Sequence, residues 1–86
     1  MNWEQFSSFD KAKPIRIIAP PNADGVVTAA MLVKFLLKHS YAFEVTFGSR
    51  TGEQNIFING STGINITGKP ASHACYEFTQ SDQLLA

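Results

Sequence analysis

The 86-residue chain contains little charge, a single cysteine and only two histidines. Charged residues make up 16% of it, compared with about 25% in an average soluble domain. A single cysteine, Cys75, excludes an internal disulfide and a cysteine-based zinc site, and its apolar context in HACYEF indicates a core residue. The formal net charge of zero excludes a strong overall attraction to nucleic acid or to an anionic membrane.

Targeting signals and long apolar runs are also lacking. The N-terminal sequence MNWEQFSSFDKAK has no apolar region typical of a signal peptide, which predicts a cytoplasmic protein. The longest mostly apolar stretch, Val26 to Leu37, contains Lys34 and is too short to span a membrane. Low charge with 44% hydrophobic residues indicates a surface partly covered by another chain. We therefore expect protein partners or a homo-oligomer, no membrane association, and only weak or indirect nucleic-acid binding.

The length predicts one domain over residues 1–86, with an N-terminal helix and linker over residues 1–13. Trp3, Phe6 and Phe9 recur every three residues, which places their side chains on one stripe of a helix. The spacing therefore predicts a short helix across these residues, with its aromatic side chains docked on the domain.

A strand, a loop and a long helix follow the linker. The apolar run Ile15–Ala19 stops at Pro20 and Pro21, which predicts a buried strand because proline cannot donate to a strand ladder. The segment Gly25–His39 is apolar around most of its circumference, which predicts a helix. Asp24 precedes it and is the expected N-cap.

The predicted central helix has two apolar sides. Its sheet-facing side is expected to comprise Val26, Ala29, Ala30, Val33 and Leu37. A second side requires another cover, and we expect it to bind a partner together with the N-terminal aromatic residues. This predicted partner-binding set is Val27, Met31, Phe35, Trp3, Phe6 and Phe9.

The second half of the sequence predicts short strands separated by turns. The expected strands lie at residues 43–47, 55–58, 63–67 and 74–78, and a helical turn is expected at 81–85. Asn59 and Gly60 predict a type I′ hairpin turn. The strand–helix–strand order at the start predicts a right-handed crossover between parallel strands. The expected fold class is α/β, a small mostly parallel sheet with a βαβ unit.

The polar loop before the central helix lies where open α/β sheets bind ligands, at the carboxyl end of a strand. A helix N-terminus suits an anion, but the charge of Asp24 repels one, and the loop lacks the glycines and lysine of phosphate-binding motifs. Asp24 is also the only carboxylate available to a metal ion in this loop. A helix cap is the simplest interpretation, with a phosphate site and a metal site as alternatives.

Two segments resemble motifs of the DHH-family phosphoesterases, especially RecJ-like nucleases of the archaeal kind. In IRIIAPPNADGVVTAAMLVKFL, Asp24-Gly25 matches the end of the family's HxDxDG loop, and Thr28-Ala29-Ala30 matches its small-residue helix start. In IFINGSTG, Asn59 stands where the second motif has a metal-binding aspartate. The resemblance implies the N-terminal part of a DHH domain.

The resemblance also implies a degenerate metal site. The family's loop ligands fall at Pro20, Asn22 and Asp24, its second-motif ligand falls at Asn59, and only Asp24 is a carboxylate. No Asp-His-His triplet occurs in the corresponding third region, Gly68–His73. Hard divalent cations need anionic oxygen ligands, so the resemblance implies a truncated relative with no catalytic residues, no metal and no cofactor.

RecJ-like proteins of the archaeal kind associate with the GINS complex and the replicative helicase. The resemblance therefore implies a non-catalytic protein-interaction subunit of a DNA replication or repair assembly. The alternatives are a metal-dependent phosphodiesterase or nuclease completed by another chain, a small phosphate- or nucleotide-binding domain, and a chance likeness. A degenerate site requires Asp24 and Asn59 to converge at one edge of the sheet, whereas a distant hairpin at Asn59 would separate them.

Overall fold

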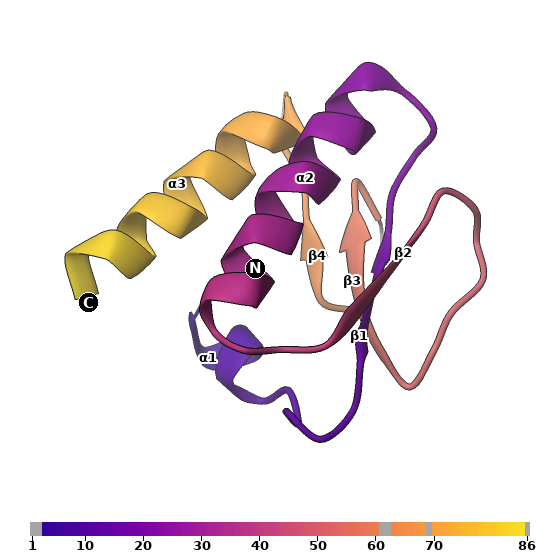
Figure 1. The fold of residues 1–86 in the computed structure, drawn as a ribbon. Helices are drawn as coiled ribbons and strands as arrows, with labels where there is room; N and C mark the ends of the chain where they lie inside the picture. The colour runs from indigo at the N-terminus through magenta and orange to yellow at the C-terminus, as the bar shows by residue number, and fades with distance from the viewer. Residues whose placement is uncertain (1–2, 61–62, 69, 86) are drawn as a thin grey trace.

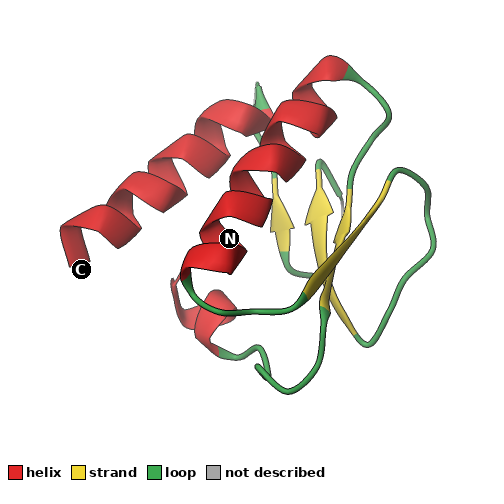
Figure 2. Ribbon diagram, in the orientation of Figure 1, coloured by secondary structure: helices red, strands yellow, loops and turns green. Residues whose placement is uncertain are grey.

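The computed structural model describes residues 3–60, 63–68 and 70–85. Its described part contains a parallel sheet of strand order β2-β1-β3-β4 and helices on one face of it (Figures 1 and 2). The elements are α1 (Trp3–Ser7), β1 (Ile15–Ile18), α2 (Ala23–Lys38), β2 (Phe43–Thr46), β3 (Gln54–Ile58), β4 (Asn65–Ile66) and α3 (Ala71–Leu85). The predicted α/β class with a βαβ unit is confirmed.

The core lies between the sheet and the pair α2 and α3, which run side by side over the same face (Figure 2). Alternate residues of the central strands point into this layer, as the two-residue period of a strand requires. Ile15, Ile17 and Ile56 are fully buried there, while Arg16 lies on the opposite face and pairs with Glu44. The predicted core position of Cys75, on α3, is confirmed.

Helix α1 is fastened to the domain by aromatic contacts. The Phe6 ring lies 4.9 Å from the ring of Phe35 and 5.0 Å from that of Tyr41, centroid to centroid, in edge-on arrangements. Phe9 is also buried, which confirms that these aromatic side chains dock on the domain. The helix ends at Ser7, two residues before the predicted end.

The predicted sheet-facing side of α2 is wrong for most of its residues. Val26 and Leu37 are 51% and 61% exposed, and Ala30 is exposed as well. The buried residues are instead Gly25, Thr28, Ala29, Leu32, Phe35 and Leu36. The reason is that α3 packs along one side of α2. The residues of α2 that are buried are therefore those that face the sheet and α3 together, and not those that face the sheet alone. Buried Thr28 is satisfied because its hydroxyl donates to the Asp24 carbonyl at 2.7 Å.

The predicted strand over residues 74–78 is wrong, since residues 71–85 form one helix, α3. The predicted helical turn over residues 81–85 is confirmed as helical, and it is the last part of this longer helix. Ala71, Cys75 and Phe78 follow a helical spacing, and all three are buried.

The predicted hairpin at Asn59 and Gly60 is also wrong, because β4 runs parallel to β3. Asn59 does adopt a left-handed conformation, with φ of 58°, and its backbone N–H donates to Ile66 at 2.8 Å. The Asn-Gly pair thus changes the direction of the chain at the end of β3, where the short connection to the parallel strand β4 begins. The strand expected over residues 63–67 is reduced to Asn65–Ile66.

Candidate functional site

The first turns of α2 and α3 meet at the carboxyl ends of the parallel strands. Helix α2 begins at Ala23, and its N-cap is Asn22, whose side-chain oxygen accepts a hydrogen bond from the Gly25 N–H at 2.8 Å. Asn22 has extended backbone angles, which an N-cap residue requires, whereas Asp24 is already helical. The prediction that Asp24 caps this helix is therefore wrong.

The Asp24 carboxylate points to the other helix. One oxygen accepts a hydrogen bond from the Ala71 N–H and the other from the Ser72 N–H, both at 3.0 Å. These donors belong to the first turn of α3, where N–H groups lack partners within the helix. Asp24 thus satisfies the start of a helix that lies 47 residues further along the chain.

The electrostatics of this contact favour the charged carboxylate. The backbone hydrogen bond from Ser72 is the main cause that lowers the pKa of Asp24 below its ordinary value of 3.8. Desolvation opposes this effect, while further hydrogen bonds from Ser72, Ala71 and Asn59 add to it. The positive end of the α3 dipole acts in the same direction. Asp24 therefore stays ionised at neutral pH and contributes a fixed negative charge to the base of α3.

Gly25 has a packing role at the same edge. A Cβ atom on this residue would lie 2.1 Å from the carbonyl oxygen of Pro20, so a larger residue cannot be accommodated there without a backbone shift. The absence of a side chain lets the loop fold back over the start of α2. Both residues of the Asp-Gly pair that resembles the DHH motif therefore have a structural role: Asp24 binds the start of α3, and Gly25 allows the close approach of Pro20.

The structure brings Asn59 to Asp24. The side-chain amide of Asn59, at the end of β3, lies 3.4 Å from a carboxylate oxygen of Asp24. This is the convergence expected of a degenerate metal site, and it is incompatible with a distant hairpin. Of the other two degenerate-site positions, Asn22 is committed to capping α2, and Pro20 packs against Gly25. Residues 3–60, 63–68 and 70–85 contain no group of three or more acidic, histidine or cysteine side chains that could hold a metal ion.

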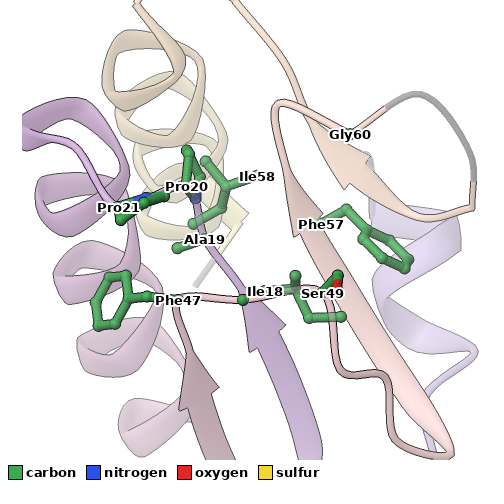
Figure 3. Close-up of a pocket in the computed structure, with 10 residues that line it drawn as sticks. Ile18, Ala19, Pro20, Pro21, Phe47, Ser49, Phe57, Ile58 and Gly60 are labelled. Carbon is green, nitrogen blue, oxygen red and sulfur yellow. The ribbon is translucent and has the colours of Figure 1, made fainter.

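A shallow hollow of about 350 Å³ adjoins this edge (Figure 3). It is lined by the ends of β1, β2 and β3, with Pro20 and Pro21 on one side and the rings of Phe47 and Phe57 pointing away from each other. Ser49 supplies the one side-chain hydroxyl among its lining residues. The hollow has no charged lining group that would recognise a phosphate or a divalent cation.

Sequence reasoning missed the backbone donors of Ala71 and Ser72. The cause was the interpretation of residues 74–78 as a strand, which hid the helix N-terminus in front of them. The signal that would have revealed it is Pro70 followed by the apolar residues Ala71, Cys75 and Phe78 at helical spacing. His73, expected in a turn, lies exposed in the first turn of α3 and pairs with Glu77 at 2.9 Å.

The predicted partner-binding residues divide into two groups. Phe35, Phe6 and Phe9 are 4%, 4% and 8% exposed, so these rings belong to the core and are not available to a partner. Val27 is 51% exposed and Met31 is half-buried, one turn apart on α2. The side chain of Trp3 lies outside the described part of the structure.

Next to Met31, α2 and α3 enclose a groove of about 410 Å³. The residues that line it are Met31, Lys34, Phe35, Lys38, Tyr76, Thr79 and Gln80. Tyr76 is 53% exposed at its margin. The groove combines apolar and aromatic surface with lysine side chains from α2. Cys75 lies in the core, and burial raises the pKa of its thiol to about 12, which favours the protonated form at neutral pH.

No family model matches the chain, and neither the curated proteins nor the solved structures give a match. None of the described helices is long and apolar enough to span a bilayer.

Proposed function

We propose that this chain is a non-catalytic, DHH-like protein-interaction subunit of a DNA replication or repair assembly. The observation that carries the proposal is the state of Asp24, whose two carboxylate oxygens accept hydrogen bonds from the backbone of α3. The residue that resembles a metal ligand of the DHH loop is thereby employed in joining two helices.

A divalent cation would meet two obstacles at this edge. It would have to displace the Ala71 and Ser72 N–H groups from Asp24, and it would face the positive end of the α3 dipole. The neighbouring amides of Asn22 and Asn59 bring no negative charge to offset that of the metal. Hydrolytic chemistry of the DHH type would therefore need ligands from another chain.

Partner binding is supported by the exposed surface of α2 that borders the groove between α2 and α3. Val27 and Met31 present apolar surface one turn apart, and the adjoining groove adds Tyr76, a residue type enriched at interface hot spots. Lys34 and Lys38 on the wall of the groove favour a partner segment that carries acidic as well as apolar side chains. The GINS complex and the replicative helicase are the partners that the resemblance suggests.

A matched pair of substitutions tests this surface. Val26 and Val27 are adjacent and equally exposed at 51%, but only Val27 lies on the stripe that continues into the groove. Val27→Asp should weaken binding to a GINS-type complex or to the replicative helicase by roughly tenfold or more, measured by sedimentation velocity. Val26→Asp should leave that binding unchanged. Equal effects of the two substitutions, or no complex with the unaltered chain, would contradict the proposal.

Calorimetry with manganese separates this function from the nuclease alternative. Titration of the chain with millimolar Mn²⁺ should release no heat beyond that of dilution. Saturable heat that disappears in the Asp24→Asn variant would instead favour a metal-dependent phosphodiesterase, because it would show that Asp24 can leave α3 to bind a cation.

A further inference from the structure

The β2 edge of the sheet carries an apolar surface that the proposed partner contact does not use. Val45 pairs in register with Ile17, which is fully buried beneath the helices, so Val45 points to the helix side of the sheet. Phe43 lies on the same side because strand side chains alternate, and Phe47 follows Thr46, the last residue of β2. Val45 is 38% exposed and Phe47 is 46% exposed, since no further strand lies beyond β2 in the described sheet.

The backbone of this edge is directed outward at the same residues. Ala42 and Thr46 use their carbonyl oxygens to accept hydrogen bonds from Ile15 and Ala19 of the β1 segment, both at 2.9 Å. Backbone groups alternate in direction along a strand, so those of Phe43 and Val45 point away from the sheet. An added strand would find its hydrogen-bonding partners at these positions.

Three devices that usually protect an edge strand, namely lysine, proline and a bulge, are missing from β2. Natural edges carry lysine, proline or a bulge, or are very short, and these features prevent pairing with another chain. The sequence of β2 has neither lysine nor proline, and its sole charge, Glu44, is held by Arg16 at 2.6 Å. The opposite edge of the sheet, β4, consists of only two residues. The β4 edge is therefore too short to pair extensively with another strand, whereas the β2 edge is long enough to do so.

Helix α2 extends the apolar surface above this edge. Val26, Ala30, Val33 and Leu37 recur at spacings of four and three residues, which places them along one side of the helix. This side lies across the helix from Met31 and Phe35, which line the groove toward α3. Val26 and Leu37 are among the most exposed large apolar residues of the described chain. The stripe contains no charged residue.

We propose that a second copy of this chain docks here, with β2 pairing antiparallel to β2 of the second copy around a two-fold axis at Val45. This register sets Phe43 opposite Phe47 of the other copy on the helix side. On the other face it sets Glu44 opposite Thr46. A register centred on Glu44 would instead oppose two like charges, which is destabilising.

The second copy fits this surface better than an unrelated strand does. The sequence FEVTF is nearly symmetric about Val45, so antiparallel pairing around this residue places no two like charges opposite each other. The net charge of zero removes overall repulsion between copies. The α2 stripes of both copies flank the joined strands and extend the buried apolar surface. The groove between α2 and α3 lies on the other side of α2 and stays open, so the dimer does not depend on the proposed function.

Sedimentation velocity over a roughly hundredfold concentration range tests the dimer. The unaltered chain should approach twice its mass of 9.4 kDa as its concentration rises. Val45→Lys should weaken self-association by roughly tenfold or more, and Val26→Asp should weaken it to a smaller extent. Val27→Asp is the matched control and should leave it unchanged. Circular dichroism of each variant should match that of the unaltered chain, which serves as the control for folding.

A gain-of-affinity variant tests the register and does not rely on loss of folding. Thr46→Lys places an amine opposite Glu44 of the second copy and should tighten the dimer by about threefold. A chain that stays monomeric throughout would overturn the proposal. So would a dimer that Val45→Lys leaves intact, or one that Thr46→Lys weakens. Loss of GINS or helicase binding in Val27→Asp with an intact dimer would bear on the proposed function alone.

Discussion

The two long helices of this domain begin in different ways. The first turn of α2 is satisfied by Asn22, which immediately precedes the helix and accepts a hydrogen bond from Gly25. The first turn of α3 is satisfied by Asp24, 47 residues before Ala71. A local cap stabilises one helix, whereas a distant cap also fixes where that helix lies. The second arrangement commits the Asp24 carboxylate to holding the start of α3 in place.

The largest expected effect comes from removing the distant cap. Asp24→Ala leaves the Ala71 and Ser72 N–H groups without an acceptor and releases the start of α3 from α2. The melting temperature should fall by about 10 °C, as measured by circular dichroism. The conservative Asp24→Asn variant should recover part of the loss, because an amide oxygen can accept one of the hydrogen bonds.

Removal of the local cap should have a smaller effect. Asn22→Ala deletes one acceptor at the start of α2 and should reduce the free energy of unfolding by about 1 kcal/mol, measured by urea denaturation. Helix α2 retains its packing on the sheet and on α3, so its position should not change. If Asn22→Ala destabilised the domain more than Asp24→Ala, the contrast between the two caps would be wrong.

Acid should weaken the distant cap but not the local one. The pKa of Asp24 is lowered in the folded chain, so its contribution is fully present above the unfolded value near 4 and is lost as pH falls through the folded value. Urea denaturation at pH 3 and pH 7 should therefore show a larger loss in the unaltered chain than in Asp24→Asn. Equal losses would mean that Asp24 is not bonded to α3.

The smallest effect is expected at Asn59. Its amide is exposed and lies 3.4 Å from Asp24, a long distance for a hydrogen bond, so loss of this side-chain contact in Asn59→Ala should lower the free energy of unfolding by less than about 0.5 kcal/mol. The left-handed backbone at this position adds a small cost of its own. Asn59→Gly removes that backbone cost, and comparing the two variants by urea denaturation separates the side chain from the backbone.

The sequence sufficed to predict the elements formed by strong local patterns. The apolar run before Pro20 is β1, the broad apolar segment after Asp24 is α2, and the alternation in residues 43–47 contains β2. In each of these elements the residues that face the core are apolar, so the spacing of apolar residues in the sequence indicates the type of element. The resemblance to DHH motifs also directed attention to Asp24 and Asn59, which the structure places side by side.

The features that sequence reasoning missed depend on contacts between distant segments. Which side of α2 is buried depends on α3, and the short apolar spacing in residues 74–78 suits a strand as well as it suits a helix. The cap at Asp24 could not be separated from that at Asn22, because both residue types are good N-caps. Only the position of α3 shows that the carboxylate acts at a distance.

The central claim is that Asp24 serves α3 and not a metal ion, and NMR of the ¹⁵N-labelled chain with added Mn²⁺ tests it most directly. Bound manganese broadens the signals of nearby amides, and those of Ala71 and Ser72 lie 3.0 Å from the Asp24 carboxylate. The account predicts that these two signals keep their intensity relative to the rest of the chain at millimolar Mn²⁺. Their selective loss at substoichiometric metal would contradict it.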